Sequence, residues 1–567
     1  MRIPKGKGLV ALAVVAATAM MTLAAAGSAA VRGDSGSKGS SASTTLIYAG
    51  ASDPTFLDPA LVSDGESFRI SKQIFEGLVD LKPGSTSVQP SLATSWSISK
   101  NGKTWTFNLR HGVKFSDGTA FNAKAVCYNF NRWYNFTGPF QDAGATYYYQ
   151  AIFLGFHHND PSETSLRAAV YKSCKTKGSY TAMITLTKKY GPFLPALSLS
   201  SFAMQSPTAL KKYHADEATI TNGAFTPTAA NTYAFQHPTG TGPFKFSSWT
   251  VHQKLVLVRN ANYWGKKSKL KQIVVVPIAD NSARLQALQT GEVNAMDLLQ
   301  PQDVSKVQGS SNLKTASRPA FNVAYVGINQ SKPPFDKLAV RQAVAYGLNR
   351  QAVVNTFYAG RAQVANEFMP PSLFGYAKDV QKYTYDPAKA KQLLQSAGLS
   401  LPVSVDFYYP TGVSRPYMPD PQGIFQIFQQ SLNNSGFHVI PHTEPWRPQY
   451  VADVNAGNAG QLNMIGWTGD YGDPDDFIGV FFKGGNPAFG FSNVTLTNLL
   501  NQAAAETSQS KRVTLYQKAN RMIMKNILPG VPYAHTKPAL GFQDSVKGYI
   551  ASPTGSESFA PVYFGGQ

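Results

Sequence analysis

The sequence predicts an α/β protein with more than one domain. Two observations support this fold class. The chain has 567 residues, which is enough for two or three domains and a large core. In its second half, segments with helical spacing of apolar residues alternate with short apolar runs. That alternation is typical of α/β architecture rather than of an all-β protein, and we find no internal repeat in the sequence.

In the first half of the chain, the clearest local signal is a hairpin. Residues 95–109 alternate in polarity around Asn101-Gly102, a dipeptide typical of two-residue β-turns. The other elements follow from the spacing of apolar residues. We expect strands at 45–49, 180–186, 244–246, 254–258 and 271–277, and helices at 68–79, 123–133 and 282–289.

The second half carries the alternation itself. Its predicted helices have apolar residues three and four positions apart, and its predicted strands are short apolar runs. We expect helices at 339–349, 387–396, 423–433 and 511–526, and strands at 323–328, 403–408 and 438–440.

The N-terminal residues are typical of a secretory signal peptide. Basic residues at 2, 5 and 7 precede an alanine-rich apolar run, and small residues follow it. We expect residues 1–30 to be removed on export and the Gly/Ser-rich residues 31–43 to form a flexible linker. The protein should therefore act on the outer side of a bacterial membrane. Ala26 stands where a lipoprotein signal has its lipidated cysteine, so the chain as written cannot be acylated there.

The net charge raises the question of nucleic acid as a partner. The chain has 52 basic and 32 acidic residues, a formal charge of +20. However, it contains no block of five or six consecutive basic residues, and its densest basic cluster, at 266–271, is short. No zinc-finger spacing or P-loop pattern accompanies that cluster. A diffuse basic surface is the better interpretation, and we expect no nucleic-acid partner.

Cysteine and metal-ligand residues are few. Two cysteines in an exported chain favour one disulfide between Cys127 and Cys174, and the alternative is two buried thiols. The His157-His158 pair offers too few ligands for a firm metal site. The aspartates at 473, 475 and 476 lack the ordered spacing and later glutamate of a calcium-binding EF-hand. We therefore predict no metal and no cofactor.

One loop stands out as a candidate ligand site. Residues 462–467 form an apolar run that suits a buried strand, and glycine, aspartate and proline then follow together, as in a tight loop. Trp467 and Asp470 lie where a rigid strand gives way to this loop, and such positions often bind ligands. The carboxylate could act as acid, base, metal ligand or counter-ion. Alternatively, the aspartates only accept hydrogen bonds from the turn's backbone.

Several motifs together resemble one known family. They run in order from about residue 45 to the C-terminus, and they resemble the extracellular solute-binding proteins of peptide and nickel ABC importers. The loop at 466–477 and the segment 546–549 are most similar to the family members that bind dipeptides. The other matching stretches lie at 74–79, 90–96, 102–118, 240–244, 260–264 and 340–346.

This resemblance implies roles for particular residues. Asp470 would bind the α-ammonium group of a peptide, Arg415 in the segment 414–417 would bind its α-carboxylate, and Trp467 would form an apolar wall. Burying a zwitterion is costly unless both charges are paired, and a carboxylate with a planar guanidinium meets that demand. Residues 419–421 and 51–56 depart from the family pattern. The remaining predicted ligand contacts are Tyr417, Gly469, Ser52 and Asp53.

The resemblance also implies a two-lobed periplasmic-binding-protein-like fold with two chain crossings at its hinge. Lobe I would comprise 44–276, with a subdomain at about 85–180, and the C-terminal return at 536–567. Lobe II would comprise 277–535.

The implied function is non-catalytic. A monomer would capture short peptides, dipeptides first, and deliver them to a membrane permease driven by an ATPase. The alternatives are longer peptides, haem or a nickel chelate as ligand. A secreted hydrolase is more distant, because the sequence has no Gly-x-Ser-x-Gly or His-Glu-x-x-His motif.

Overall fold

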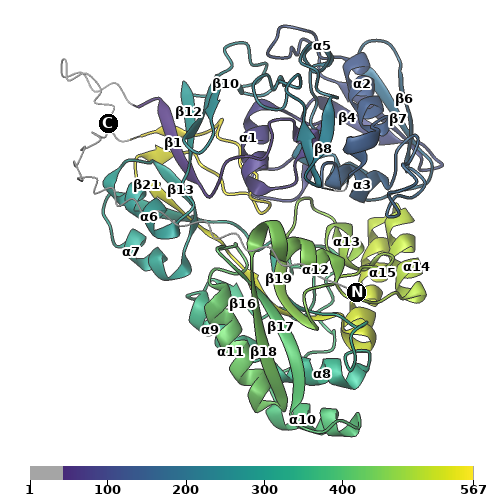
Figure 1. Ribbon diagram of the computed structural model, residues 1–567. Helices are drawn as coiled ribbons and strands as arrows, with labels where there is room; N and C mark the ends of the chain where they lie inside the picture. Colours follow the sequence, from purple (N-terminus) through teal and green to yellow (C-terminus); the bar gives the residue numbers. More distant parts are fainter. Residues whose placement is uncertain (1–42, 143, 566–567) are drawn as a thin grey trace, which may run out of the picture. The chain divides into compact units, whose positions relative to one another are not determined.

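The computed structural model describes residues 43–142 and 144–565. The predicted signal peptide at 1–30, and the predicted linker apart from Ser43, lie outside these residues. Within the described part, no helix is both long and apolar enough to cross a membrane. Most strands belong to three sheets, with helices packed around them (Figure 1).

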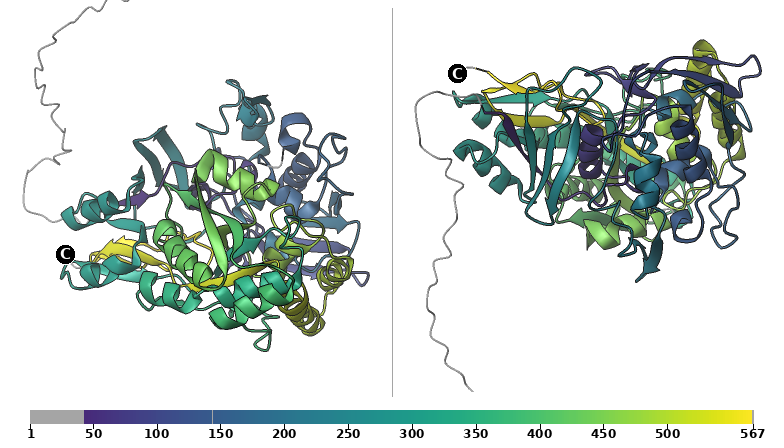
Figure 2. Two further views of the ribbon diagram at one scale, coloured as in Figure 1. Left: turned by 60° about the horizontal axis from the view of Figure 1, so that its bottom comes forward. Right: turned by 90° about the horizontal axis from the view of Figure 1, so that it is seen from above.

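The first sheet has seven strands in the order β10-β11-β12-β1-β13-β21-β14. Its centre is β1, which pairs in parallel with β12 and with β13. The C-terminal strand β21 lies between β13 and β14, and Figure 2 shows this yellow segment among teal strands. The strands are β1 (Thr45–Gly50), β10 (Phe244–Thr250), β11 (Lys254–Arg259), β12 (Gln272–Pro277), β13 (Ala295–Leu299), β14 (Leu313–Ser317) and β21 (Ala539–Gln543).

The second sheet has six strands in the order β16-β20-β15-β19-β17-β18. Every residue of β15 and β20 is buried, as expected for central strands covered on both faces. The helix α11 packs on β17 and β18, and α8 and α9 pack on β20 (Figure 1). The strands are β15 (Asn322–Ile328), β16 (Ala362–Gln363), β17 (Val403–Thr411), β18 (Phe437–Pro445), β19 (Leu462–Thr468) and β20 (Gly530–Thr536).

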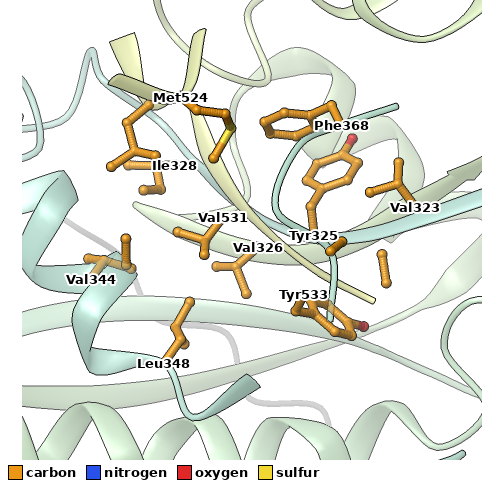
Figure 3. Close-up of a cluster of buried hydrophobic side chains, with 14 of the residues drawn as sticks. Val323, Tyr325, Val326, Ile328, Val344, Leu348, Phe368, Met524, Val531 and Tyr533 are labelled. Carbon is orange, nitrogen blue, oxygen red and sulfur yellow. The ribbon is translucent and has the colours of Figure 1, made fainter. Parts of the chain in front are cut away.

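The core of this sheet is a continuous set of apolar side chains. Figure 3 shows Val326 and Val531 from the paired strands β15 and β20 beside Val344 and Leu348 from the α8 region. Each of these four side chains is fully buried. Burial on this scale is the main favourable contribution to folding and fixes the strands that carry the candidate site.

A four-stranded antiparallel sheet, β4-β5-β7-β6, lies mostly in the predicted subdomain, whose expected limit at about residue 180 falls just before β7. The Asn101-Gly102 hairpin prediction is confirmed, because β4 pairs with β5 and Gly102 adopts a φ of +70°. The disulfide prediction is also confirmed, since Cys127 of α2 is bonded to Cys174 of β6. The strands are β4 (Ala93–Ile98), β5 (Thr104–Leu109), β6 (Tyr171–Thr176) and β7 (Thr181–Leu186).

Short two-stranded sheets complete the strand pairing. They are β2 (Val79–Leu81) with β3 (Val88–Pro90), β8 (Ala218–Thr221) with β9 (Ala224–Pro227), and β22 (Val546–Lys547) with β23 (Tyr563–Phe564).

The helices begin where capping residues predict them. Asp280, Asp386 and Asp420 each accept a hydrogen bond from the first turn of the helix that follows. The predicted helix at 68–79 is shifted: Asp64 caps it, it ends at Ile74, and Val79 already begins β2. The first helices are α1 (Gly65–Ile74), α2 (Ala123–Tyr134), α3 (Tyr147–Phe153), α4 (Phe193–Ala196), α5 (Pro207–Lys212), α6 (Asn281–Thr290) and α7 (Val304–Gln308).

The remaining helices surround the six-stranded sheet and the loop that follows β19. They are α8 (Leu338–Gly347), α9 (Arg350–Phe357), α10 (Pro387–Ser396), α11 (Pro421–Asn434), α12 (Val451–Ala456), α13 (Ile478–Phe482), α14 (Val494–Ala505) and α15 (Gln509–Met522).

The chain crosses from one large sheet to the other twice within the described residues. The first crossing joins β14 to β15, and the second joins β20 to β21. The two run side by side, because the Arg318 N–H donates to the Pro538 carbonyl at 2.9 Å. This is the predicted two-lobed fold. The predicted domain limits remain a proposal, and strand pairing favours a different boundary: β13 and β14 belong to the first sheet, so lobe I would continue past residue 276 to Ser317.

Candidate ligand-binding site

The candidate site lies at one edge of the six-stranded sheet. Strand β17 pairs in parallel with β18 on one side and with β19 on the other. The carboxyl ends of neighbouring parallel strands meet at the same sheet edge, where α/β proteins commonly bind ligands. Arg415 follows β17, Trp446 follows β18, and Trp467 and Asp470 lie at the end of β19. The topology therefore brings these four residues to one edge.

Arg415 is held in a tight turn and has no carboxylate partner among the described residues. Its backbone N–H and carbonyl exchange hydrogen bonds with Met418 at 3.0 and 2.9 Å. The guanidinium carbon lies 4.4 Å from the centre of the Trp446 ring, a cation–π contact. Its Nε is buried without a hydrogen-bond partner in the described part of the chain. The side chain is thus positioned to receive an anionic group.

Asp470 provides a carboxylate at the same edge of the sheet, opposite in charge to the Arg415 guanidinium. Its backbone N–H donates to Asp476 Oδ2 at 2.7 Å, and its own Oδ2 accepts a hydrogen bond from the Tyr148 hydroxyl of α3. No lysine or arginine of the described residues forms an ion pair with it. Burial raises the pKa of the Asp470 carboxyl well above its usual range. A cationic ligand group would supply the missing partner.

The other aspartates of the loop are already engaged. Asp473 accepts two hydrogen bonds from Arg512, at 2.7 and 2.8 Å. Asp475 pairs with Lys483 at 2.8 Å and also accepts from the Tyr190 hydroxyl at 3.0 Å. Burial, and then the charge of Asp470, raise the pKa of the Asp476 carboxyl well above its usual range. These carboxylates fix the loop, which leaves Asp470 as the one suited to bind a ligand.

Aromatic side chains surround the two charged groups. Trp467 is half-buried, and its ring centre lies 5.8 Å from Phe481 and 6.4 Å from Tyr147. Tyr417 packs against the glycine at 466, where a Cβ would come within 2.4 Å of its ring. Gly469 is needed for similar reasons, because a Cβ there would lie 2.3 Å from the Phe321 ring. Tyr417 and Gly469 therefore shape the site by packing.

A cavity of about 100 Å³ opens beside Asp470. Its lining comes from α1, from the turn at 80–84, from residues 198–200 and from the C-terminal segment 550–561. Of the predicted ligand contacts, only Asp470 is among its lining residues in the described part of the chain. The cavity thus lies on the side of the site that carries the carboxylate.

Comparison with known proteins decides the family. Residues 87–489 match the family described as "Bacterial extracellular solute-binding proteins, family 5 Middle". The chain belongs to this family. It is 31% identical over 543 residues to heme-binding protein A of Haemophilus influenzae, covering 93% of this chain and 94% of that protein. It is also 31% identical over 533 residues to the dipeptide-binding protein of Escherichia coli K12, covering 91% and 94%.

A solved structure agrees with this assignment. The periplasmic binding protein DppA of Helicobacter pylori, described as ABC transporter-associated and solved in complex with the peptide STSA, superposes with a TM-score of 0.76. It is 28% identical, and the match covers 92% of this chain and 98% of that one. This family 5 solute-binding protein therefore has the two-lobed fold of a periplasmic binding protein.

In this solute-binding protein, Ser52 and Asp53 lie in the loop after β1. Asp53 accepts hydrogen bonds from the Trp249 indole at 2.8 Å and from the His252 N–H at 2.9 Å. It thereby fixes the turn between β10 and β11. Ser52 is exposed, and its hydroxyl donates to the Asp53 carbonyl at 3.0 Å. A ligand-binding role for these two residues remains a prediction, and the contacts of Asp53 favour a structural role.

The sequence reasoning missed two site residues, Tyr148 and Trp446. Tyr148 lies 322 positions from Asp470 in the chain, and a hydrogen bond over that separation leaves no local pattern. The one visible signal was the run of three tyrosines at 147–149. Trp446 could be placed only once β18 was known to pair with β17.

Proposed function

We propose that this protein captures short peptides, dipeptides first, and delivers them to the membrane permease of an ABC importer. One observation carries the proposal. Asp470 and Arg415 have opposite charges, lie at the ends of neighbouring parallel strands, and have no ion-pair partner among the described residues. A free dipeptide has an ammonium group and a carboxylate that complement these two charges.

The electrostatics favour a peptide over haem. Relatives named for heme and for dipeptides are equally identical to this chain, at 31%, so identity alone does not choose the ligand. Haem carries carboxylates that suit Arg415 but no ammonium group for Asp470. An unpaired buried carboxylate is costly, so a ligand that neutralises both residues is the better match.

We also propose that the protein is exported, acts as a monomer and releases its ligand unchanged. A relative described as ABC transporter-associated and crystallised with a peptide supports the link to an importer. The match to a solute-binding family supports a role in capture rather than in catalysis.

The test is calorimetric titration of residues 43–567 with Ala-Ala, with its C-terminal amide and with its N-acetyl derivative. Free Ala-Ala should bind, and both blocked forms should bind about 100-fold more weakly, because each leaves one buried charge unpaired. Arg415→Ala should weaken Ala-Ala binding and abolish its advantage over the amide. Asp470→Asn should abolish its advantage over the acetylated form.

A matched control is Arg521→Ala, which removes an exposed arginine paired with Asp379. This variant should bind Ala-Ala as the parent protein does. Equal binding of tetra-alanine, or of the amidated dipeptide, by the parent protein would contradict the dipeptide proposal in favour of longer peptides. Tight binding of haem with none of Ala-Ala would favour the haem alternative.

A further inference from the structure

We propose that the cavity beside Asp470 receives the side chain of the ligand's first residue and selects uncharged polar side chains, such as those of glutamine, asparagine, serine and threonine. This inference rests on the proposed function, in which Asp470 binds the α-ammonium group. The first side chain branches from the same Cα that carries this group. A cavity that Asp470 lines is therefore placed to receive that side chain.

The size of the cavity suits one side chain. Its volume is about 100 Å³, which is less than the roughly 150 Å³ of an apolar protein cavity that holds one benzene molecule. A glutamine or methionine side chain is of this scale, and an indole ring is larger. Volume alone therefore excludes the largest side chains but does not distinguish polar from apolar ones.

The lining combines apolar side chains, among them Phe68, Leu199 and Ile550, with several hydroxyl groups, and these hydroxyls are what favour a polar side chain. Two segments contribute them, the turn around 198–200 and the C-terminal segment 552–558. Ser556 Oγ is buried and has no hydrogen-bond partner among the described residues. A hydroxyl can both donate and accept, so such a lining can satisfy an amide or another hydroxyl. The hydroxyl-bearing residues are Ser198, Ser200, Ser552, Thr554, Ser556 and Ser558.

Three of the five charged groups that line the cavity are already paired. Lys72 forms an ion pair with Asp80, and Glu557 accepts hydrogen bonds from Arg318 at 2.6 and 3.1 Å. Lys82 also lines the cavity but is an exposed residue at the turn. A charged ligand side chain would therefore lose hydration on entering, and only Lys82, at the exposed turn, is left without an ion pair as a counter-ion for it.

The test compares four dipeptides that differ in the first residue, using calorimetric titration of residues 43–567. Gln-Ala and Met-Ala have first side chains of nearly equal size but different polarity, and Glu-Ala and Lys-Ala add either charge. Gln-Ala should bind about tenfold more tightly than each of the other three. Compared with Met-Ala, it gains hydrogen bonds to the lining, whereas Glu-Ala and Lys-Ala bring in a charge that loses hydration on entering. The reversed pair, Ala-Gln and Ala-Met, should differ by less than about twofold, which assigns the preference to the first position.

The variant Ser556→Ala removes the hydroxyl that has no partner. It should reduce the Gln-Ala preference over Met-Ala severalfold. Ser305→Ala is the matched control, since Ser305 is exposed and does not line the cavity. This control should retain the full preference.

The outcomes separate this inference from the proposed function. If Ala-Ala binds but Gln-Ala, Met-Ala, Glu-Ala and Lys-Ala bind equally, the inference is overturned and the proposed function stands. A preference for Met-Ala or for either charged residue also overturns it. If no dipeptide binds, Ala-Ala included, the proposed function fails and this inference fails with it.

Discussion

Asp470 depends on its neighbours for its charge. The Tyr148 hydroxyl donates to its carboxylate, which favours the ionised form, whereas burial opposes ionisation and dominates. An ammonium group binds the ionised carboxylate, so a raised pKa makes ligand binding sensitive to mild acid. The same environment that leaves Asp470 short of a partner therefore sets the pH range in which it can bind one.

We predict that Ala-Ala binding weakens as the pH falls from 7.5 to 5.5. The pKa of the Asp470 carboxyl is raised above the ordinary value near 4, so protonation, and with it the loss of affinity, begins at a pH well above that value. Once the pH is below the raised pKa, the dissociation constant should rise roughly tenfold per pH unit. Calorimetric titration with Ala-Ala across this pH range measures the change in the dissociation constant. The Asp470→Asn variant should show a flat profile, and a flat profile in the parent protein would contradict the assignment.

The residue scale also shows what a local sequence pattern can indicate and what it cannot. Asp470 was predicted from a strand that runs into a Gly/Asp/Pro loop, and that signal is local in the chain. Arg415 was predicted from a resemblance, since an arginine before Pro-Tyr has no distinctive local pattern. The Tyr148 contact could not be predicted, because the seven-residue helix α3 has no side-chain cap and its partner lies in a distant segment.

At the scale of elements, the six-stranded sheet holds the site in place. Its central strand β15 pairs with β19, whose end carries Trp467 and Asp470. The apolar spacing of α11 and β17 made these elements predictable. The assignment of β13 and β14 to the first sheet was not predictable, because it depends on pairing with β1 and with the distant β21.

We predict that Ile328→Ala destabilises the protein by about 3 kcal/mol, the cost of a cavity in a tightly packed core. Ile328 is the last residue of β15 and is 0% exposed (Figure 3). The matched control is Ile440→Ala in β18 of the same sheet, where the side chain is 38% exposed and the expected cost is about 0.5 kcal/mol. Urea unfolding followed by tryptophan fluorescence measures both. Equal costs would contradict the assigned position of β15 at the centre of the core.

At the scale of the whole described molecule, two kinds of contact connect the lobes. The crossings at 318–321 and 537–538 form the covalent connection, and Asn322 and Thr536 exchange hydrogen bonds where the crossings end. The second kind consists of hydrogen bonds from the segment 147–190 to the loop after β19. Tyr148 bonds Asp470, and Tyr190 bonds Asp475 at 3.0 Å. A hinge at the crossings would leave the first kind intact and would break these hydrogen bonds, together with others between the lobes such as Gln300 Nε2 to Ser414 Oγ at 2.9 Å and the Gly191 N–H to the Ala504 carbonyl at 2.6 Å.

We predict that the double variant Tyr148→Phe/Tyr190→Phe opens the ligand-free protein. Two hydrogen bonds at about 1 kcal/mol each would shift the equilibrium between closed and open forms roughly thirtyfold towards the open form. Small-angle X-ray scattering should show a larger radius of gyration for the ligand-free variant than for the parent. Saturating Ala-Ala should return the variant to the parent's value, because a ligand bound to Asp470 and Arg415 of lobe II would also contact the lobe I residues that line the cavity beside Asp470. An unchanged radius in the ligand-free variant would mean that these tyrosines do not hold the lobes together, and a radius that stayed large with bound ligand would mean that the peptide is held by one lobe alone.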